Sequence, residues 1–396
     1  MRAGRYIKQA SNYRAFIPKP LPPEPFITYD NDLTLLLSKA DRCLGRLDGV
    51  TTVLPNPDLF VGMYVRHEAV LSSQIEGTQS TLEDILQFEA DAEGHNMPKD
   101  IEEVVNYVRA MNYGIERLTN FPLSLRLIKE IHGELLKGVR GETRRPGEFR
   151  ESQNWIGPAG ADISRAVFVP PPVHEMKEAL GNLENFLHED SYPVLIQCAL
   201  VHAQFETIHP FLDGNGRIGR LLITLLLCQR EILQRPLLYL SYYLKAHRAE
   251  YYDRLMSVRN DGNWEGWIKF FLRGVISVSQ SATETAREIL DLREDHKRRI
   301  LSEAGSRNAG PLKLLDYLYL HPVLTIKNVQ LHLQCTFRTA SNVIEHLAKL
   351  NIIEETTGQR RNRAYRYTAY LELFAEPDIL ETADQAEGMI KITGNR

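Results

Sequence analysis

Residues 209–220 read HPFLDGNGRIGR, and this stretch joins two apolar segments that carry the 3.6-residue period of buried helices. Gly214 and Gly216 let the backbone adopt turns that other residues rarely adopt, so successive N–H groups can point into one concavity where the second helix begins. Such a helix N-terminus attracts anions, and Arg217 and Arg220 add two guanidinium groups on adjacent turns. The stretch therefore predicts a helical protein with a loop that binds a di- or triphosphate.

The helical period continues on both sides of this loop. A proline-rich segment, residues 18–25, predicts an extended chain, and we expect folding to begin after it. Ser80 and Glu83 have the spacing of a capping box. Apolar residues recur at helical spacing over 31–47, 59–75, 101–118, 125–136, 173–187, 194–208, 218–232, 249–258 and 264–290. The expected fold class is mainly α, a helical bundle.

Two polar side chains in the loop suggest chemistry. Asp213 is a hard oxygen ligand suited to Mg²⁺, which typically binds one or two carboxylates together with substrate phosphates. His209 is the one group of the loop that can accept a proton near neutral pH. The loop lacks the lysine of GxxxxGK[ST] and follows a helix, so it is not a Walker loop. Together these residues favour base-assisted transfer of a phosphate-containing group onto a hydroxyl.

Two other interpretations of the loop stay open. Asp-Gly-Asn-Gly is also a good turn sequence, and a histidine-proline pair often only ends a helix. His202, Glu206 and His209 share one helical face, as zinc ligands could. However, Glu206 is not at the HExxH position, and Pro210 ends the helix beside the third ligand.

The motif HPFLDGNGRIGR resembles the signature of Fic-domain proteins, HPFx[D/E]GNGRxxR, at every fixed position. The resemblance implies a Fic helical bundle that transfers AMP from Mg·ATP to a Ser, Thr or Tyr hydroxyl of a protein. It makes His209 the base and Asp213 the magnesium ligand. Gly214, Asn215 and Gly216 would surround the α- and β-phosphates, with Asn215 and Arg217 counted as catalytic. Arg217 would contact the β-phosphate and Arg220 the γ-phosphate.

Residues 72–77, SSQIEG, place Ser72 and Glu76 four apart on one helix face, with Gly77 as a C-cap. An exposed glutamate near a helix end is usually solvated. Beside a Fic motif, the segment resembles the family's inhibitory helix, expected over about 59–76, with Glu76 paired to Arg220. The resemblance implies that such a carboxylate blocks productive binding of ATP.

Residues 149–172 break the helical pattern with Gly157, Pro158 and Gly160 between two short strand-like runs. We expect a β-hairpin flap, and residues 155–172 resemble the Fic hairpin that holds a target protein by strand addition. The resemblance also suggests adenine-pocket candidates, although ordinary packing and a helix end explain them about as well. These candidates are Tyr243, Tyr251, Tyr252 and Asn260.

Residues 311–370 carry eight Lys or Arg against four Asp or Glu, a local charge of +4. Helical patterns over 312–319, 326–333 and 338–350 precede aromatic, hairpin-like residues, an order that resembles a winged helix-turn-helix. The expected major-groove residues are Arg338, Thr339, Ser341 and Asn342, and the expected wing-tip residues are Arg360, Arg361 and Arg363. The same module could instead dock a protein or form a dimer.

The chain has 396 residues with a formal net charge of −4 and 43% hydrophobic residues, typical of a globular protein of two or three domains. The four cysteines are scattered without a CxxC, which excludes a disulfide framework and favours a reducing cytoplasm. The first 25 residues have no apolar h-region, and the longest apolar run, residues 221–228, is too short to span a bilayer. We expect a cytoplasmic protein with no membrane association.

The expected organisation is an N-terminal helical segment over 1–92, a Fic catalytic core over 93–296, a linker over 297–310, and a winged-helix domain with tail over 311–396. The function expected from the resemblance is an autoinhibited protein adenylyltransferase that uses ATP and Mg²⁺ and modifies a protein docked on the flap, including itself. One alternative is a DNA-binding regulator whose Fic body senses nucleotide. Another is a Fic enzyme that transfers a different phosphate group or removes AMP. A homodimer stays open.

Overall fold

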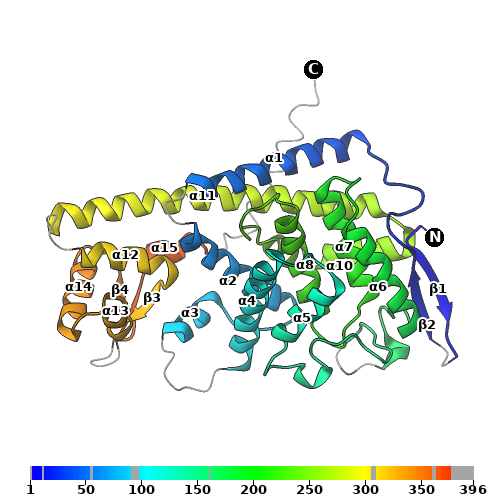
Figure 1. Cartoon of the computed structure of the whole chain (residues 1–396), viewed down its shortest axis with the longest axis horizontal. Helices are drawn as coiled ribbons and strands as arrows, with labels where there is room; N and C mark the ends of the chain where they lie inside the picture. The colour runs from blue at the N-terminus through cyan, green and yellow to red at the C-terminus, as the bar shows by residue number, and fades with distance from the viewer. Residues whose placement is uncertain are drawn as a thin grey trace. The chain divides into compact units, whose positions relative to one another are not determined.

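The computed structural model describes residues 2–10, 13–53, 57–90, 98–158, 160, 162–304, 309–358 and 363–375 (Figure 1). The chain divides into two compact units, one of residues 1–88 and 93–284 and one of residues 89–92 and 285–396. Helices dominate both units, and the strands form two small antiparallel sheets. The mainly helical fold class is therefore confirmed.

The helices up to the site are α1 Asn31–Val53, α2 Asp58–Ile75, α3 Leu82–Ala90, α4 Lys99–Leu118, α5 Leu125–Leu135, α6 Val173–Leu187 and α7 Val194–Ile208. They are followed by α8 Asn215–Gln229, α9 Ser241–Ala246, α10 Arg248–Asp261 and α11 Trp264–Ala304. Two 3₁₀ turns, η1 Glu142–Arg144 and η2 Ile163–Arg165, lie in the connections.

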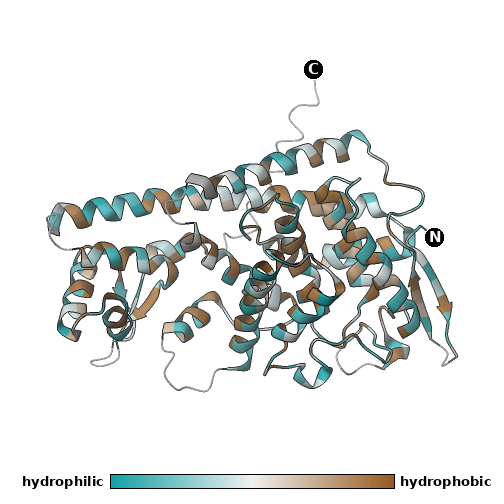
Figure 2. Cartoon of the chain, in the orientation of Figure 1, coloured by the Kyte–Doolittle hydropathy of each residue, from teal (hydrophilic) through white to brown (hydrophobic). Residues whose placement is uncertain are grey.

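Helix α7 is the centre of the larger unit. Every residue from Leu195 to Ile208 is buried, including the polar residues of the helix. Helices α6, α8 and α10 and the strand β2 pack against it. Figure 2 shows the hydropathy of each residue along these helices. The loop 209–214 thus leaves the core at the end of α7 and re-enters it as α8, whose residues from Arg217 to Leu227 are buried.

The N-terminal segment differs from the prediction of an extended chain before the first folded element. Residues Gly4–Lys8 (β1) and Arg14–Pro18 (β2) form an antiparallel hairpin. Ala15 and Phe16 are fully buried, because β2 packs against α7. Folded structure therefore begins well before the prolines of residues 18–25.

Two local predictions need correction. The capping interaction before α3 is made one residue later than predicted: the Asp84 carboxylate accepts from the Thr81 backbone N–H at 2.8 Å, and the Thr81 hydroxyl accepts from the Asp84 N–H at 3.2 Å. In the flap, the described residues of 149–172 contain a single antiparallel bridge, Ile156 with Phe168, and the turn η2. Prolines 158 and 170–172 lack the N–H groups that would extend this ladder.

The second unit contains the end of α11 followed by α12 Gly310–Leu320, β3 Val323–Thr325, α13 Ile326–Leu333, α14 Phe337–Lys349, β4 Glu354–Glu355, β5 Ala364–Arg366 and α15 Thr368–Glu372. Its sheet has the order β3-β5-β4 with antiparallel neighbours. Thr325 caps α13 with a capping box and Thr336 caps α14. The interpretation of this unit as a winged helix stays a prediction.

The predicted contact residues of this unit lie partly outside the described chain. Arg338, Thr339 and Asn342 are exposed on α14 and Ser341 is half-buried, whereas Arg360 and Arg361 are outside the described residues. Residues 297–304 of the predicted linker are the last turns of α11. Among the described helices, none combines the length and the apolar character that crossing a membrane requires.

Candidate active site

Two residues in the left-handed backbone conformation determine the shape of the loop between α7 and α8. His209 follows the last residue of α7 with φ +48°, and Gly214 precedes α8 with φ +75°. The first residues of α8, Asn215 and Gly216, therefore begin the helix three residues earlier than the apolar period predicts. Their N–H groups are among the four that an α-helix leaves without an intrahelical partner. The N-terminus of α8 is thus available to an anion.

Polar side chains hold the loop in place. The Asn215 side chain accepts from the Phe211 N–H and donates to the Phe211 carbonyl, both at 2.8 Å. Asn154, at the start of the flap, donates to the carbonyls of His209 at 3.1 Å and Phe211 at 2.8 Å. Arg150, fully buried, donates its Nε–H to the His209 carbonyl at 3.0 Å and a second N–H to the Pro171 carbonyl. The loop and the flap therefore share their supports.

His132 on α5 fixes the position of Asp213. Its Nδ1 accepts from the Gly147 N–H at 2.9 Å, so Nε2 carries the proton that is donated to the Asp213 carbonyl at 3.0 Å. The imidazole also stacks on Phe211, with ring centroids 3.7 Å apart. Desolvation lowers the pKa of His132 to about 4. The neutral ring is the form that makes both hydrogen bonds.

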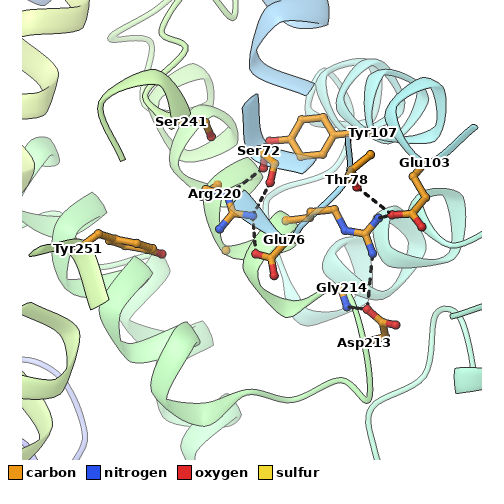
Figure 3. A network of polar contacts seen from close by, with 12 residues as sticks. Ser72, Glu76, Thr78, Glu103, Tyr107, Asp213, Gly214, Arg220, Ser241 and Tyr251 are labelled. Atoms are coloured by element: carbon orange, nitrogen blue, oxygen red, sulfur yellow. Dashed lines mark hydrogen bonds and ion pairs between the residues drawn. The ribbon is translucent and has the colours of Figure 1, made fainter. Parts of the chain in front are cut away.

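Arg217 is buried and engaged with two carboxylates. Its Nη1 donates to Glu103 of α4 at 3.2 Å, and its Nη2 lies 3.5 Å from the Asp213 Oδ1. Thr78 donates to the same Glu103 oxygen at 3.4 Å (Figure 3). The Arg217 Nε is buried without a hydrogen-bond partner among the described residues. The guanidinium therefore keeps one donor free while the carboxylates fix its plane.

Arg220 is bound by the segment predicted to be inhibitory (Figure 3). Its Nη2 donates to Glu76 Oε1 at 2.7 Å and to the Ser72 carbonyl at 3.0 Å, and its Nε donates to the Ser72 hydroxyl at 2.8 Å. Desolvation raises the pKa of Glu76, but the charge and the hydrogen bond of Arg220, together with the charge of Arg217, outweigh it, and the pKa lies below its usual value. Glu76 is thus an anion in its ion pair.

The Glu76 carboxylate also lies at the predicted anion site, the concavity formed by residues 214–216 at the N-terminus of α8, which we call the anion cradle. A Cβ atom placed on Gly216 would be 2.1 Å from Glu76 Oε1 and 3.0 Å from Arg220 Nη1. Only a glycine at position 216 leaves room for that oxygen at the N-terminus of α8. Gly77, with φ +100°, ends α2 just after Glu76 and turns the chain away. The carboxylate therefore occupies the place that the sequence assigns to a phosphate.

Strong positive charge surrounds His209. Desolvation, followed by the charges of Arg259 and Arg150, lowers the pKa of His209 to about 3, against an opposite contribution from Glu76. Its Nδ1 is buried and has no hydrogen-bond partner in the described part of the chain. The imidazole is thus neutral at physiological pH, the form that a general base requires.

The donor set at Asp213 fits a magnesium ion. The carboxylate is about one-third exposed, and its Oδ1 accepts from the Gly214 N–H at 2.6 Å. Within the described residues, no group of three or more His, Cys, Asp or Glu is arranged to hold a metal. A single carboxylate suits Mg²⁺, since this ion usually retains waters and takes its other ligands from substrate phosphates.

The zinc interpretation of the α7 face is not supported. His202 uses both ring nitrogens, with Nδ1 2.9 Å from the Gly219 carbonyl and Nε2 2.8 Å from the Tyr251 hydroxyl. The Glu206 carboxylate instead lies against Gly219, where a Cβ would be 2.4 Å from Oε1. These contacts leave no room for a metal shared by the three side chains.

The adenine-pocket candidates do not form one group. Tyr251 is buried and engaged with His202, whereas the side-chain Oδ1 of Asn260 accepts from the hydroxyl of Tyr6, on the N-terminal hairpin, at 3.0 Å. Tyr243 stacks on His247 with centroids 4.1 Å apart, and Tyr252 is 41% exposed. Desolvation raises the pKa values of both Tyr251 and Tyr252, and the charges of Glu76 and Arg220 act on both hydroxyls.

Several supporting residues were not found from the sequence: Glu103, His132, Arg150, Asn154 and Arg259. Glu103 and Arg217 are 114 positions apart, and a lone charged residue in an amphipathic helix is usually solvated. The catalytic motif was found because its residues are contiguous.

Comparison with known families places this site in context. Residues 34–116 match the Fic/DOC family N-terminal model, and residues 122–227 match the Fic/DOC family model. Residues 34–227 therefore belong to the Fic/DOC family, as the motif indicated. The motif 209–220 and the segment predicted to be inhibitory, residues 72–77, both lie within this region.

Among named relatives, the chain is 30% identical over 216 residues to the protein adenylyltransferase Fic of Aedes aegypti, covering 52% of this chain and 39% of that protein. It is 28% identical over 194 residues to a probable protein adenylyltransferase of Aquifex aeolicus, covering 48% of this chain and 56% of that protein. The chain thus spans 39% of the length of the first relative and 56% of the second.

A solved structure shares the fold. The crystal structure of a Fic family protein from Desulfovibrio desulfuricans G20 aligns with a TM-score of 0.55 at 20% identity, covering 86% of this chain and 97% of that one. At this identity the likeness concerns the fold alone.

Proposed function

We propose that the chain is an autoinhibited protein adenylyltransferase, which transfers AMP from Mg·ATP to a Ser, Thr or Tyr hydroxyl of a protein. The observation that carries the proposal is the Glu76 carboxylate, 2.7 Å from Arg220 and seated against Gly216 at the N-terminus of α8. An internal anion at this place indicates that the loop is built for negative charge. The names of the relatives support adenylyl transfer as the reaction.

In the proposed reaction, neutral His209 accepts the proton of the target hydroxyl. The hydroxyl oxygen forms a bond to the α-phosphorus of ATP, the bond to the bridging oxygen breaks, and pyrophosphate leaves with that electron pair. Asn215, Gly216 and Arg217 would hold the phosphates, so that positioning and charge neutralisation lower the barrier. Asp213 would hold Mg²⁺, which when bound neutralises charge on the phosphates.

The proposed autoinhibition follows from the same contacts. While Glu76 pairs with Arg220, the guanidinium and the space over Gly216 are taken, and the terminal phosphate of ATP has no cation there. Ser72 holds Arg220 from the same helix turn. The chain with the Glu76–Arg220 pair intact should therefore be nearly inactive. A target protein docked on residues 155–172 would be modified only after Glu76 has left Arg220.

Intact-mass spectrometry after incubation with Mg·ATP tests this function. Glu76→Gly should gain one AMP per modified site on itself or on added lysate protein, while the parent gains little and the double variant Glu76→Gly/His209→Ala gains none. The matched control is Glu116→Gly, which removes an exposed glutamate in the last turns of α4. A gain of phosphate alone, or equal activity of parent and Glu76→Gly, would overturn the assignment.

A further inference from the structure

One buried cation near the site has no role in the proposed reaction. Arg259, on α10, is 4% exposed, and its guanidinium carbon lies 3.9 Å from the ring centroid of Phe168 in the flap. Its Nε donates to the Thr207 hydroxyl at 3.1 Å, and its Nη2 donates to the Glu206 carbonyl at 3.1 Å. A single side chain thus joins the flap to the last turn of the helix that carries His209.

The N-terminal hairpin holds the same flap residues from another direction. The Phe16 N–H of β2 donates to the Val169 carbonyl at 2.9 Å, and the Phe16 ring lies 6.0 Å from the Phe168 ring. Phe16 and Phe168 are 0% and 2% exposed. Gln204 on α7 also donates to the Lys19 carbonyl at 2.8 Å, which ties the hairpin to the catalytic helix.

These contacts converge on Phe168 in the flap. The described residues of the flap form a single bridge, in which the Ile156 N–H donates to the Phe168 carbonyl at 2.8 Å and the Phe168 N–H donates to the Ile156 carbonyl at 3.1 Å. An isolated bridge of this kind is weak, since two paired strands alone are marginally stable in water. Arg150 and Asn154 hold the ends of the flap, so the position of its middle depends on what holds Phe168.

We propose that Arg259 is a positioning residue that, together with the hairpin β1–β2, fixes the flap relative to His209 by clamping Phe168. This rests on the proposed function, because the flap would present the target hydroxyl to the imidazole. A guanidinium can stack its plane on an aromatic face while its edge donates to the end of a helix. A lysine keeps the charge but cannot stack on the ring and donate to the end of the helix at the same time.

Hydrogen exchange tests the clamp without any reference to activity. In Arg259→Lys, the amides of Ile156 and Phe168 should exchange about tenfold faster than in the parent, while those of α7 keep their rates. If Arg259→Lys does not fold, Phe168→Leu, which keeps an apolar side chain, should show the same faster exchange of the flap amides. Arg254→Lys, on the same helix and paired with Glu250, is the matched control. Unchanged flap exchange in both variants would overturn the proposal.

A second readout connects the clamp to transfer. In a Glu76→Gly background, Arg259→Lys should reduce AMP incorporated into protein per pyrophosphate released by about tenfold, because water then replaces the misplaced hydroxyl as acceptor and free AMP is released, with the KM for ATP unchanged. An equal loss of ATP binding and incorporation would indicate a merely structural role and sink the proposal. If Glu76→Gly alone releases no pyrophosphate and incorporates no AMP, the proposed function has failed, while the exchange measurement still judges the clamp.

Discussion

Glu206 is a buried carboxyl beside the candidate active site. It is 6% exposed, its Oε1 has no hydrogen-bond partner within the described residues, and it lies beside His209 on the catalytic helix. Desolvation raises its pKa to about 7, against the opposing charges of Arg220 and Arg259. A carboxyl of this kind is half-protonated near neutrality, so the charge of the site depends on pH.

Replacing this carboxyl should change the pH dependence of folding. The unfolded carboxyl loses its proton near 4.5 and the folded one near 7, so the parent loses stability as pH rises through this window. Glu206→Gln lacks this titration. The parent's free energy of unfolding, relative to Glu206→Gln, should fall by about 1.4 kcal/mol per pH unit at most between pH 5 and 7, then level off.

Urea unfolding at pH 5, 6, 7 and 8 measures that difference. Glu116→Gln, on the exposed side of α4, corrects for the loss of a formal negative charge. If the stabilities of parent and Glu206→Gln run parallel across this range, the carboxyl titrates as it does in water and burial does not raise its pKa.

At the scale of elements, His132 shows how three segments are joined at the loop. It connects α5, the Gly147 turn and the Asp213 carbonyl through two hydrogen bonds, and stacks on Phe211. His132→Phe should keep the stack and lose both hydrogen bonds, which costs about 1–3 kcal/mol because it leaves buried backbone groups unpaired. Thermal or urea unfolding measures this, with His188→Phe, at the exposed end of α6, as control. A variant as stable as the parent would show that these bonds contribute nothing.

The elements that could be predicted are those with strong local signals. Helices 173–187, 194–208 and 326–333 have the predicted bounds, because prolines precede the first two and the apolar period is regular. Helix α8 begins earlier than predicted, since Gly214 ends the turn directly before Asn215. The hairpin β1–β2 was missed because its buried face depends on α7, nearly two hundred residues away.

The same distinction applies to the site. The motif residues and the pairing of Glu76 with Arg220 could be predicted, the latter only through the family resemblance. The contact of Arg217 with Glu103 and the clamp on Phe168 could not, because each joins residues whose proximity only the packed fold decides. Contiguous sequence predicts the chemistry of the loop, and tertiary packing determines what holds it.

On the scale of the whole molecule, the family region of residues 34–227 contains both the anion cradle and the carboxylate that fills it. The unit of residues 285–396 lies outside the family matches, and its role as a winged helix or docking module stays a prediction. The proposed function therefore depends on one relation inside the larger unit, in which Glu76 holds the position of a nucleotide phosphate.

Calorimetric titration with Mg·ATP measures this relation directly, comparing the parent, Glu76→Gly and the control Glu116→Gly. Removing the competing carboxylate should tighten ATP binding at least about tenfold, equivalent to 1.4 kcal/mol. AMP, which lacks the β- and γ-phosphates, should bind the parent and Glu76→Gly with equal affinity. If ATP binds all three proteins equally well, Glu76 does not compete with a phosphate and the proposed autoinhibition is contradicted.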